Sequence, residues 1–255
     1  MTDYIQTERD GAVLTIRLNR ADKKNAITAA MYSAMAAALR SADIDSSAKV
    51  AILTGSGDSF TAGNDLKDFA ENPPTDPSAP VFQFMDAMAS FTKPIVAGVN
   101  GVAVGIGTTL LLHCDWVIAV PSAKFALPFV NFALVPEYAS SLLLPRFIGA
   151  RKAQELLMSG EAFDAESALT WGLIGAVVAA DQLESAIKTK AMMLAAKPPS
   201  ALRHTKSLLR GDLAQIKAVI AAEAKVFGAQ LKSAELQEAV SAFFAKRPAD
   251  FSKFS

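Results

Sequence analysis

The order of the predicted elements constrains the fold of this sequence more than any other property. Over about the first half of the chain, short apolar runs alternate with helical stretches, and from about Ser140 the sequence is mainly helical. Such alternation is typical of an α/β core. The runs that predict strands are 12–18, 49–53, 94–100 and 116–120. We therefore expect an α/β fold.

Helix signals and prolines divide the chain further. Thr28 is placed to cap an alanine-rich helix that runs to about Arg40, and a second helix, 105–112, begins among glycines. Four prolines in 71–80 predict an exposed, mobile loop beside the site that the preceding segment builds.

A change of pattern near residue 196 indicates two regions. Beyond Lys197-Pro198-Pro199 only helices are predicted, and 212–230 and 233–246 are the longest. We expect an α/β core over 1–195 and a helical region over 196–255.

Composition favours a globular protein from a reducing compartment. Of 255 residues, 51% are hydrophobic and 20% charged, with a formal net charge of zero, which gives no sign of nucleic-acid or membrane binding. Cys114 is the only cysteine, so no internal disulfide is possible. The beginning of the sequence lacks a signal-peptide pattern, and its ending, SKFS, is not the peroxisomal SKL signal. We expect a cytoplasmic protein, with bacterial cytosol the simplest case.

Two glycine-containing turns carry the chemistry. In FTAGNDL (60–66) a strand ends in a turn of small residues, and in NGVAVGIG (100–107) a strand leads through glycines into a helix. The first amides of a helix have no partner within it, and the positive end of the helix dipole lies there. Either turn alone is usually structural. Two such amides that converge on one point would form an oxyanion hole.

These turns, followed by CDWVIAVPSAKFALPFV, resemble the enoyl-CoA hydratase/isomerase, or crotonase, family. The similarity extends from LNRADKKNAIT to EAVSAFFAKRPADF, nearly the whole chain. It implies a core built as a ββα spiral, a helical C-terminal trimerisation region, and a homotrimer or a hexamer formed as a dimer of trimers. Apolar residues at 110–112 and 142–144 and in the helices after residue 200 are the expected contact surface.

The resemblance also implies the ligand and its site. The substrate would be an acyl-CoA thioester whose carbonyl oxygen lies between the N–H groups of Ala62 and Ile106. Coenzyme A would be part of the substrate, and no permanently bound cofactor is expected. The residues expected to bind it are Lys23, Lys24, Asn25, Ala26, Gly63, Asn64, Asp65, Leu66, Gly105, Thr109, Phe243 and Lys246.

Residue chemistry argues against the hydratase reaction. Hydratases of this family use two glutamates, and the matching positions here hold Thr109 and Phe129. Phenylalanine cannot take up a proton, and a threonine hydroxyl is a poor base near neutral pH.

A different carboxylate, Glu137, indicates an isomerase. The segment around Pro136 and Glu137 resembles the Δ3,Δ2-enoyl-CoA isomerases, especially the peroxisomal type. One glutamate suffices to move a proton from C2 to C4 of a 3-enoyl-CoA while the oxyanion hole holds the dienolate. The apolar neighbours of Glu137 in sequence would raise its pKa if they enclose it.

Two other functions stay open. The chain would be a hydratase if Glu137 acted on a water, or a non-catalytic acyl-CoA-binding member of the family. The same catalytic parts serve intermediates of fatty-acid β-oxidation and of aromatic degradation.

Several tempting residues have simpler interpretations. No metal site is expected, because His113 and Cys114 are adjacent and no second cluster has ligand spacing. Asp65 is expected to cap the helix that begins near Leu66. The side chains of Phe82, Phe84, Met85 and Met88 have the spacing of a core helix and could also line an acyl tunnel.

Overall fold

The computed structural model describes residues 3–71, 74, 76 and 78–254. Its strands are β1 (Ile5–Asp10), β2 (Val13–Leu18), β3 (Val50–Gly55), β4 (Ser59–Thr61), β5 (Ile95–Val99), β6 (Val102–Val104), β7 (Trp116–Ala119), β8 (Lys124–Ala126), β9 (Ala162–Asp164) and β10 (Ala176–Val177). Its α-helices are α1 (Ala29–Ile44), α2 (Leu66–Glu71), α3 (Pro80–Ser90), α4 (Ile106–Thr109), α5 (Ser140–Ile148), α6 (Ala150–Ser159), α7 (Ala165–Trp171), α8 (Leu183–Ala195), α9 (Pro199–Arg210), α10 (Leu213–Gln230) and α11 (Ala234–Phe244). The 3-10 helices are η1 (Ala21–Lys23), η2 (Leu110–His113), η3 (Val130–Phe132) and η4 (Ala180–Gln182).

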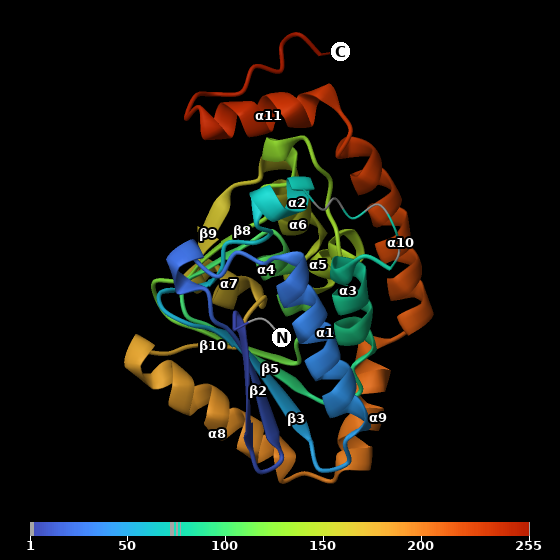
Figure 1. The fold of residues 1–255 in the computed structure, drawn as a ribbon. Helices are drawn as coiled ribbons and strands as arrows, with labels where there is room; N and C mark the ends of the chain where they lie inside the picture. Colours follow the sequence, from blue (N-terminus) through green and yellow to red (C-terminus); the bar gives the residue numbers. More distant parts are fainter. Residues whose placement is uncertain (1–2, 72–73, 75, 77, 255) are drawn as a thin grey trace.

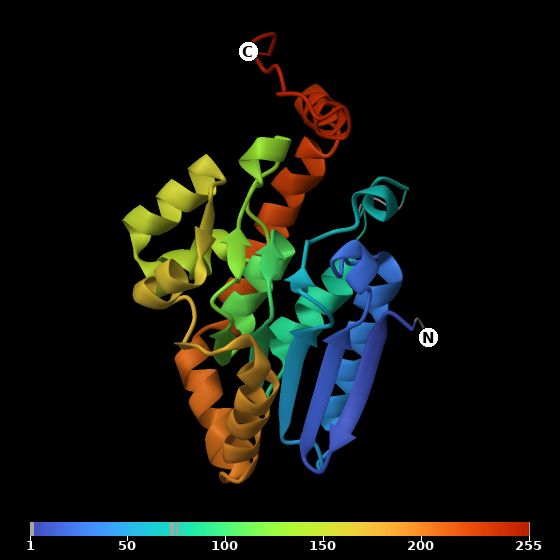
Figure 2. The same ribbon diagram turned by 90° about the vertical axis from the view of Figure 1, so that its left-hand side faces the viewer.

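The larger sheet contains all four strands predicted from the sequence. Its order is β1-β2-β3-β5-β7-β10; β1 pairs antiparallel with β2, and the other pairs are parallel. Figure 2 shows α1 and α8 on opposite sides of this sheet. The helix predicted after Thr28 is α1, and the Thr28 hydroxyl accepts a hydrogen bond from the Met31 amide. The α/β prediction for the core is therefore confirmed.

A repeated ββα unit connects the larger sheet to a smaller one. After each of β3, β5 and β7 the chain turns within a few residues and adds a short strand, β4, β6 or β8, to the smaller sheet. That sheet has the order β4-β6-β8-β9, with β4, β6 and β8 parallel. Because β4 and β6 are neighbours, the turns that follow them lie at one edge. This is the ββα spiral of the crotonase fold.

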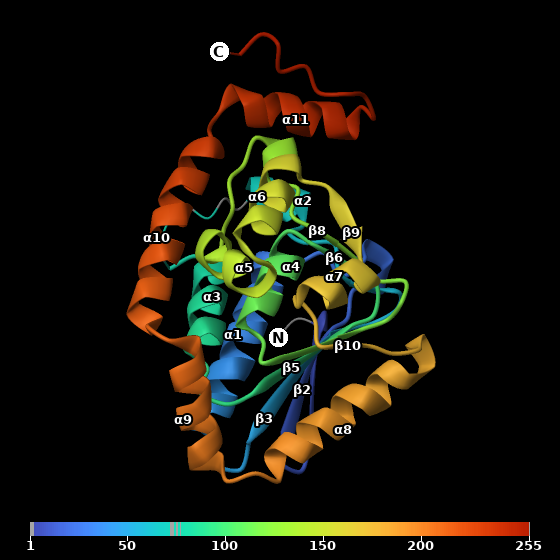
Figure 3. The ribbon, with the colours of Figure 1, turned by 180° about the vertical axis from the view of Figure 1, so that it is seen from behind.

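The helices after the core wrap around it. Figure 3 shows α10 running beside α3, and Figure 1 shows α11 crossing one end of the molecule above η3. The predicted change near residue 196 falls between α8 and α9. The division into regions 1–195 and 196–255 stays a prediction.

The segments expected to be exposed include 71–80 and the leucines at 110–112 and 142–144. Within the proline-rich segment 71–80, positions 72, 73, 75 and 77 lie outside the described residues, while Glu71 ends α2 and Pro80 begins α3. The leucines at 110–112, 143 and 144 are buried within the chain itself, so the expectation that they form contact surface is wrong. They pack into the core, where η2 contacts both α3 and α5.

Candidate active site

Two turns meet at the edge of the smaller sheet, after β4 and after β6. Thr61 of β4 pairs with Ala103 of β6. Gly63 has a φ of 91°, and a Cβ on it would lie 2.8 Å from the carbonyl oxygen of Val104. A Cβ on Gly107 would lie 2.6 Å from the Thr61 side chain. Both glycines are therefore needed for the turns to approach so closely.

The amide of Ala62 is not available to a ligand. It donates a hydrogen bond to the Lys24 carbonyl oxygen at 2.9 Å, and the Gly63 amide donates to the Thr61 hydroxyl at 3.0 Å. The assignment of Ala62 as an oxyanion donor is thus wrong, because a backbone N–H that already has a good acceptor cannot also hold a substrate oxygen.

The available amide in this turn belongs to Asn64. Ile27 donates to the Gly63 carbonyl and accepts from the Asp65 amide, as in a parallel bridge, so the Asn64 N–H points away from Ile27. Within the described part of the chain, it has no acceptor. Ile106 is the first residue of α4, so its N–H has no partner within the helix. The free amides of the two adjacent turns are therefore the N–H groups of Asn64 and Ile106.

Glu137 lies in the loop before α5 and is only 8% exposed. The Thr109 hydroxyl donates a hydrogen bond of 2.5 Å to its Oε1 atom. Burial raises the pKa of Glu137 to about 8, the Thr109 bond opposes this rise, and the charge of Glu223 adds to it. A carboxyl group with a pKa in this range can both accept and return a proton near neutral pH.

A mainly apolar cavity of about 430 Å³, including its open mouth, adjoins this carboxyl group. Asn64 and Glu137 supply its polar lining, and α2, α3 and α10 supply most of the rest. The apolar lining residues are Phe69, Pro74, Val81, Phe82, Met85, Ile220, Ala224, Phe227 and Gly228, with Tyr138 beside Glu137. Of the side chains considered for an acyl tunnel, Phe82 and Met85 line the cavity, whereas Phe84 and Met88 lie in the core.

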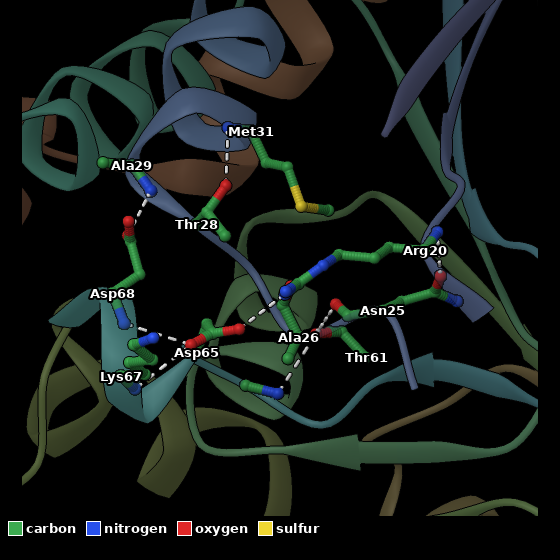
Figure 4. A network of polar contacts seen from close by, with 11 residues as sticks. Arg20, Asn25, Ala26, Thr28, Ala29, Met31, Thr61, Asp65, Lys67 and Asp68 are labelled. Carbon is green, nitrogen blue, oxygen red and sulfur yellow. Dashed lines mark hydrogen bonds and ion pairs between the residues drawn. The ribbon is translucent and has the colours of Figure 1, made fainter. Parts of the chain in front are cut away.

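The acids that follow the first turn are structural. Asp65 pairs with Arg20 at 2.6 Å and accepts from the amides of Lys67 and Asp68 (Figure 4), so the prediction that it caps α2 is confirmed. Burial alone would raise the pKa of Asp65, but these contacts outweigh burial and lower it. Asp68 accepts from the amide of Ala29 at the start of α1. Neither carboxylate is arranged as a base.

The expected coenzyme A segment is partly internal. The Asn25 side chain is fully buried and bonds to the Arg20 amide and to the carbonyls of Ser56 and Ser59, so it cannot contact a ligand. Its conformation, with a φ of 54°, shapes the turn instead. Lys23 and Lys24 are exposed on the same turn. Ala26 follows this turn and Leu66 begins α2, and the part of both residues in binding stays a prediction.

The other expected ligand contacts are spread over the chain. Phe243, on α11, is half exposed and packs against Phe132 of η3, and Lys246 is exposed just beyond α11. Gly105 precedes Ile106 with a φ of 57°. Thr109 is buried and its hydroxyl is bonded to Glu137, so it acts on that carboxyl group.

Three contacts of the site have no signal in the sequence. The Tyr32 hydroxyl donates to Asn64 Oδ1 at 2.6 Å, Glu223 lies close enough to act on Glu137, and His113 Nε2 contacts the Tyr138 carbonyl at 2.9 Å. Burial lowers the pKa of His113 to about 4, which leaves the ring neutral. Each pair is separated by at least 25 positions in the chain.

The described residues offer neither a metal site nor a membrane-spanning helix. They contain no group of three or more histidine, cysteine or acidic residues able to hold a metal ion. Among the helices of the same residues, none combines the length and apolar character required to cross a membrane.

Comparisons with known proteins agree on one family. The family model described as enoyl-CoA hydratase/isomerase matches residues 8–253. "Enoyl-CoA delta isomerase 2" of Rattus norvegicus is 34% identical over 246 residues, which cover 94% of this chain but only 63% of that protein. "1,2-epoxyphenylacetyl-CoA isomerase" of Escherichia coli (strain K12) is 33% identical over 269 residues, covering 98% of this chain and 99% of the relative.

A solved structure shows that the similarity extends to the fold. The crystal structure of an enoyl-CoA hydratase/isomerase from Pseudoalteromonas atlantica T6c has a TM-score of 0.94 and 39% identity, covering 98% of this chain and all of that one. The matching sequence model, the ββα spiral and the paired turns all point the same way: this chain belongs to the enoyl-CoA hydratase/isomerase family, within the crotonase superfamily.

Proposed function

We propose that this protein is a Δ3,Δ2-enoyl-CoA isomerase with Glu137 as its acid and base. The carboxylate of Glu137 takes a proton from C2 of a 3-enoyl-CoA, and the electron pair of that C–H bond moves into a dienolate. The resulting carboxylic acid returns the proton at C4, which gives the 2-enoyl-CoA without any other reactant. One side chain therefore serves both steps.

We further propose that the thioester oxygen lies between the amides of Asn64 and Ile106. Both N–H groups are free and belong to adjacent turns, and Ile106 adds the positive end of the α4 dipole. The acyl chain extends into the apolar cavity that begins at Glu137.

The observation that carries this proposal is the buried carboxyl group of Glu137 in the lining of a mainly apolar cavity. A hydratase of this family needs two carboxylates, and the positions that would supply them hold Thr109 and the buried ring of Phe129. The name of the rat relative supports the isomerase reaction, and the family description covers both reactions.

A panel of 3-enoyl- and 2-enoyl-CoA thioesters of several chain lengths tests the proposal. We expect 3-enoyl substrates to be converted to 2-enoyl products, with no 3-hydroxyacyl-CoA formed from the 2-enoyl substrates. Rapid hydration of a 2-enoyl-CoA would identify a hydratase, and binding without any turnover would identify a non-catalytic member of the family.

We also propose assembly as a homotrimer or a dimer of trimers. Leu208 and Leu209 on α9 are each 83% exposed, and Phe244 on α11 is 65% exposed. Large apolar side chains exposed on the helices after the core are available for contacts with further copies of the chain.

A cytoplasmic location is the remaining proposal. The lone thiol, Cys114, is buried and unpaired, which suits a reducing compartment. Fractionation of cells that produce the protein would test it.

A further inference from the structure

A second buried carboxylate, Glu223 on α10, lies behind the loop that carries Glu137. It is 8% exposed and accepts hydrogen bonds from the Ala139 amide at 2.6 Å, the Ser141 amide at 3.0 Å and the Ser141 hydroxyl at 2.5 Å. These donors lie at the N-terminal end of α5, two and four positions after Glu137. Glu223 is not among the residues that line the acyl cavity.

The backbone that Glu223 binds is conformationally unfavourable. Tyr138 and Ala139 follow Glu137 directly and have φ values of 61° and 58°. Non-glycine residues are unfavourable in this left-handed region, and they persist there only where the surroundings determine the conformation. A carboxylate that accepts from the Ala139 amide provides such a constraint.

Further contacts hold the same loop from other sides. The Gln230 side chain, two turns beyond Glu223 on α10, donates to the Ala133 carbonyl at 2.9 Å. The Tyr138 hydroxyl donates to the Met85 carbonyl of α3 at 3.1 Å, and the Tyr138 carbonyl contacts His113. Helix α10 thus holds both ends of the segment 133–141.

We propose that Glu223 is a positioning residue for the catalytic base, because it fixes the left-handed turn that presents Glu137 to the substrate. The inference rests on the proposed isomerase function. The C-terminal helix α10 thereby becomes part of the active site's supporting structure, although none of its acids touches the substrate.

The electrostatic environment of Glu137 supports this role. Besides burial, Thr109 from α4 and Glu223 act on its pKa, and the charge of Glu137 in turn raises the pKa of Tyr32 from α1 and of the adjacent Tyr138. Burial raises the pKa of both tyrosines well above the usual value, so they stay neutral. Burial also raises the pKa of Glu223, although its three hydrogen bonds lower it. The charge of Glu223 raises the pKa of Glu137 and so discourages its ionisation.

The test is Glu223→Gln, with Glu184→Gln as the matched control. A glutamine keeps the size but has one acceptor oxygen, so at least one of the two backbone amides loses its partner. Glu184 is an exposed glutamate of α8 that pairs with Arg17, and neither residue belongs to the site. We expect kcat for 3-enoyl-CoA to fall about 10- to 100-fold in Glu223→Gln, the effect of a displaced catalytic group. The KM should change by less than about twofold, since the substrate contacts are kept.

A measurement without turnover separates this inference from the proposed function. The side-chain carboxyl of Glu137 is followed by ¹³C NMR against pH, its signal identified by its loss in Glu137→Gln. The wild-type midpoint should lie at about 8. In Glu223→Gln the midpoint should fall, because the negative charge that raises the pKa of Glu137 is removed. Should the wild type fail to isomerise any substrate, the proposed function is wrong, and the NMR comparison still decides the role of Glu223.

Ser141→Ala guards against a folding defect in Glu223→Gln. It removes only the hydroxyl contact and should give a smaller loss of kcat, again at constant KM. A wild-type kcat and an unchanged Glu137 midpoint in Glu223→Gln would overturn the inference. If Glu223→Gln does not fold, a folded Ser141→Ala protein with wild-type kcat would also overturn it. Parallel changes of kcat and KM in Glu223→Gln would make Glu223 merely structural and would overturn the inference as well.

Discussion

The substitution Glu137→Gln should separate activity from stability. The amide keeps the size of the side chain and can still accept from the Thr109 hydroxyl, which lies 2.5 Å from Oε1. It cannot accept a proton from C2. Isomerisation should therefore fall at least about 100-fold, the usual contribution of a general base, while the affinity for the thioester stays nearly unchanged.

The same substitution should stabilise the protein at high pH. The pKa of Glu137 is 4.5 in an ordinary environment and about 8 in the folded protein. Between these values the unfolded chain loses this proton while the folded protein keeps it, so the free energy of unfolding falls as the pH rises from about 4.5 to about 8. The difference corresponds to roughly 5 kcal/mol, since each tenfold change in proton affinity is worth about 1.4 kcal/mol.

Chemical denaturation of wild type and variant at pH 5 and pH 9 measures this directly. Glutamine does not titrate, so the advantage of the variant should be small at pH 5 and several kcal/mol at pH 9. Equal pH dependence in both proteins would refute the reasoning from burial. A variant that isomerises at the wild-type rate would refute the assignment of the base.

Four further predictions follow from the site and the surface. The kcat/KM for a 3-enoyl-CoA should rise with pH up to about 8, because Glu137 must be ionised in the free enzyme; a profile that falls over this range would contradict its role as a base. Thr109→Val removes a hydrogen bond that lowers the pKa of Glu137, so the midpoint of that profile should move to higher pH, and a downward move would count against the contact. Ile106→Pro should reduce turnover about 100-fold in protein that circular dichroism shows to be folded, because proline fits the first position of a helix but removes the oxyanion donor. Analytical ultracentrifugation should give a multiple of 26.9 kDa, with dissociation on Leu208→Glu; a single-chain mass for the wild type would refute the assembly.

The elements that sequence periodicity predicts are those with long apolar runs. Residues 94–100 became β5, which is buried throughout, and 12–18 became β2, in which Val13, Ile16 and Leu18 are buried. The strands β4, β6 and β8 have three residues each, too few for any alternation to be visible. They exist because tight turns return the chain to a second sheet.

The error at Ala62 has a clear physical origin. Sequence identifies a turn of small residues, but which amide of the turn is free depends on partners elsewhere in the chain. The Lys24 carbonyl, 38 positions away, takes the Ala62 amide, and the bridge to Ile27 turns the Asn64 amide outward. No property of the residues FTAGN themselves distinguishes these outcomes.

The raised pKa of Glu137 was predicted, but part of the enclosure of its carboxyl group comes from helices far away in the sequence. Val130 is 37% exposed, whereas Met85 of α3 and Ile220 of α10 line the cavity beside the carboxyl group. Contacts between helices this far apart in the chain are invisible to any local pattern.

Helix α10 has two faces with different tasks, and this limits how the enzyme can be redesigned. Ala224 and Gly228 of α10 line the acyl cavity, and a Cβ at Gly228 would meet no atom within 4 Å. A modest enlargement such as Gly228→Ala should therefore shorten the cavity without moving the helix. A side chain too large for the space would instead push α10 outward, and Glu223 would move with it. Selection for a different acyl group thus acts on the reactivity of the base as well, so chain-length preference and catalytic rate are not independent traits of this enzyme.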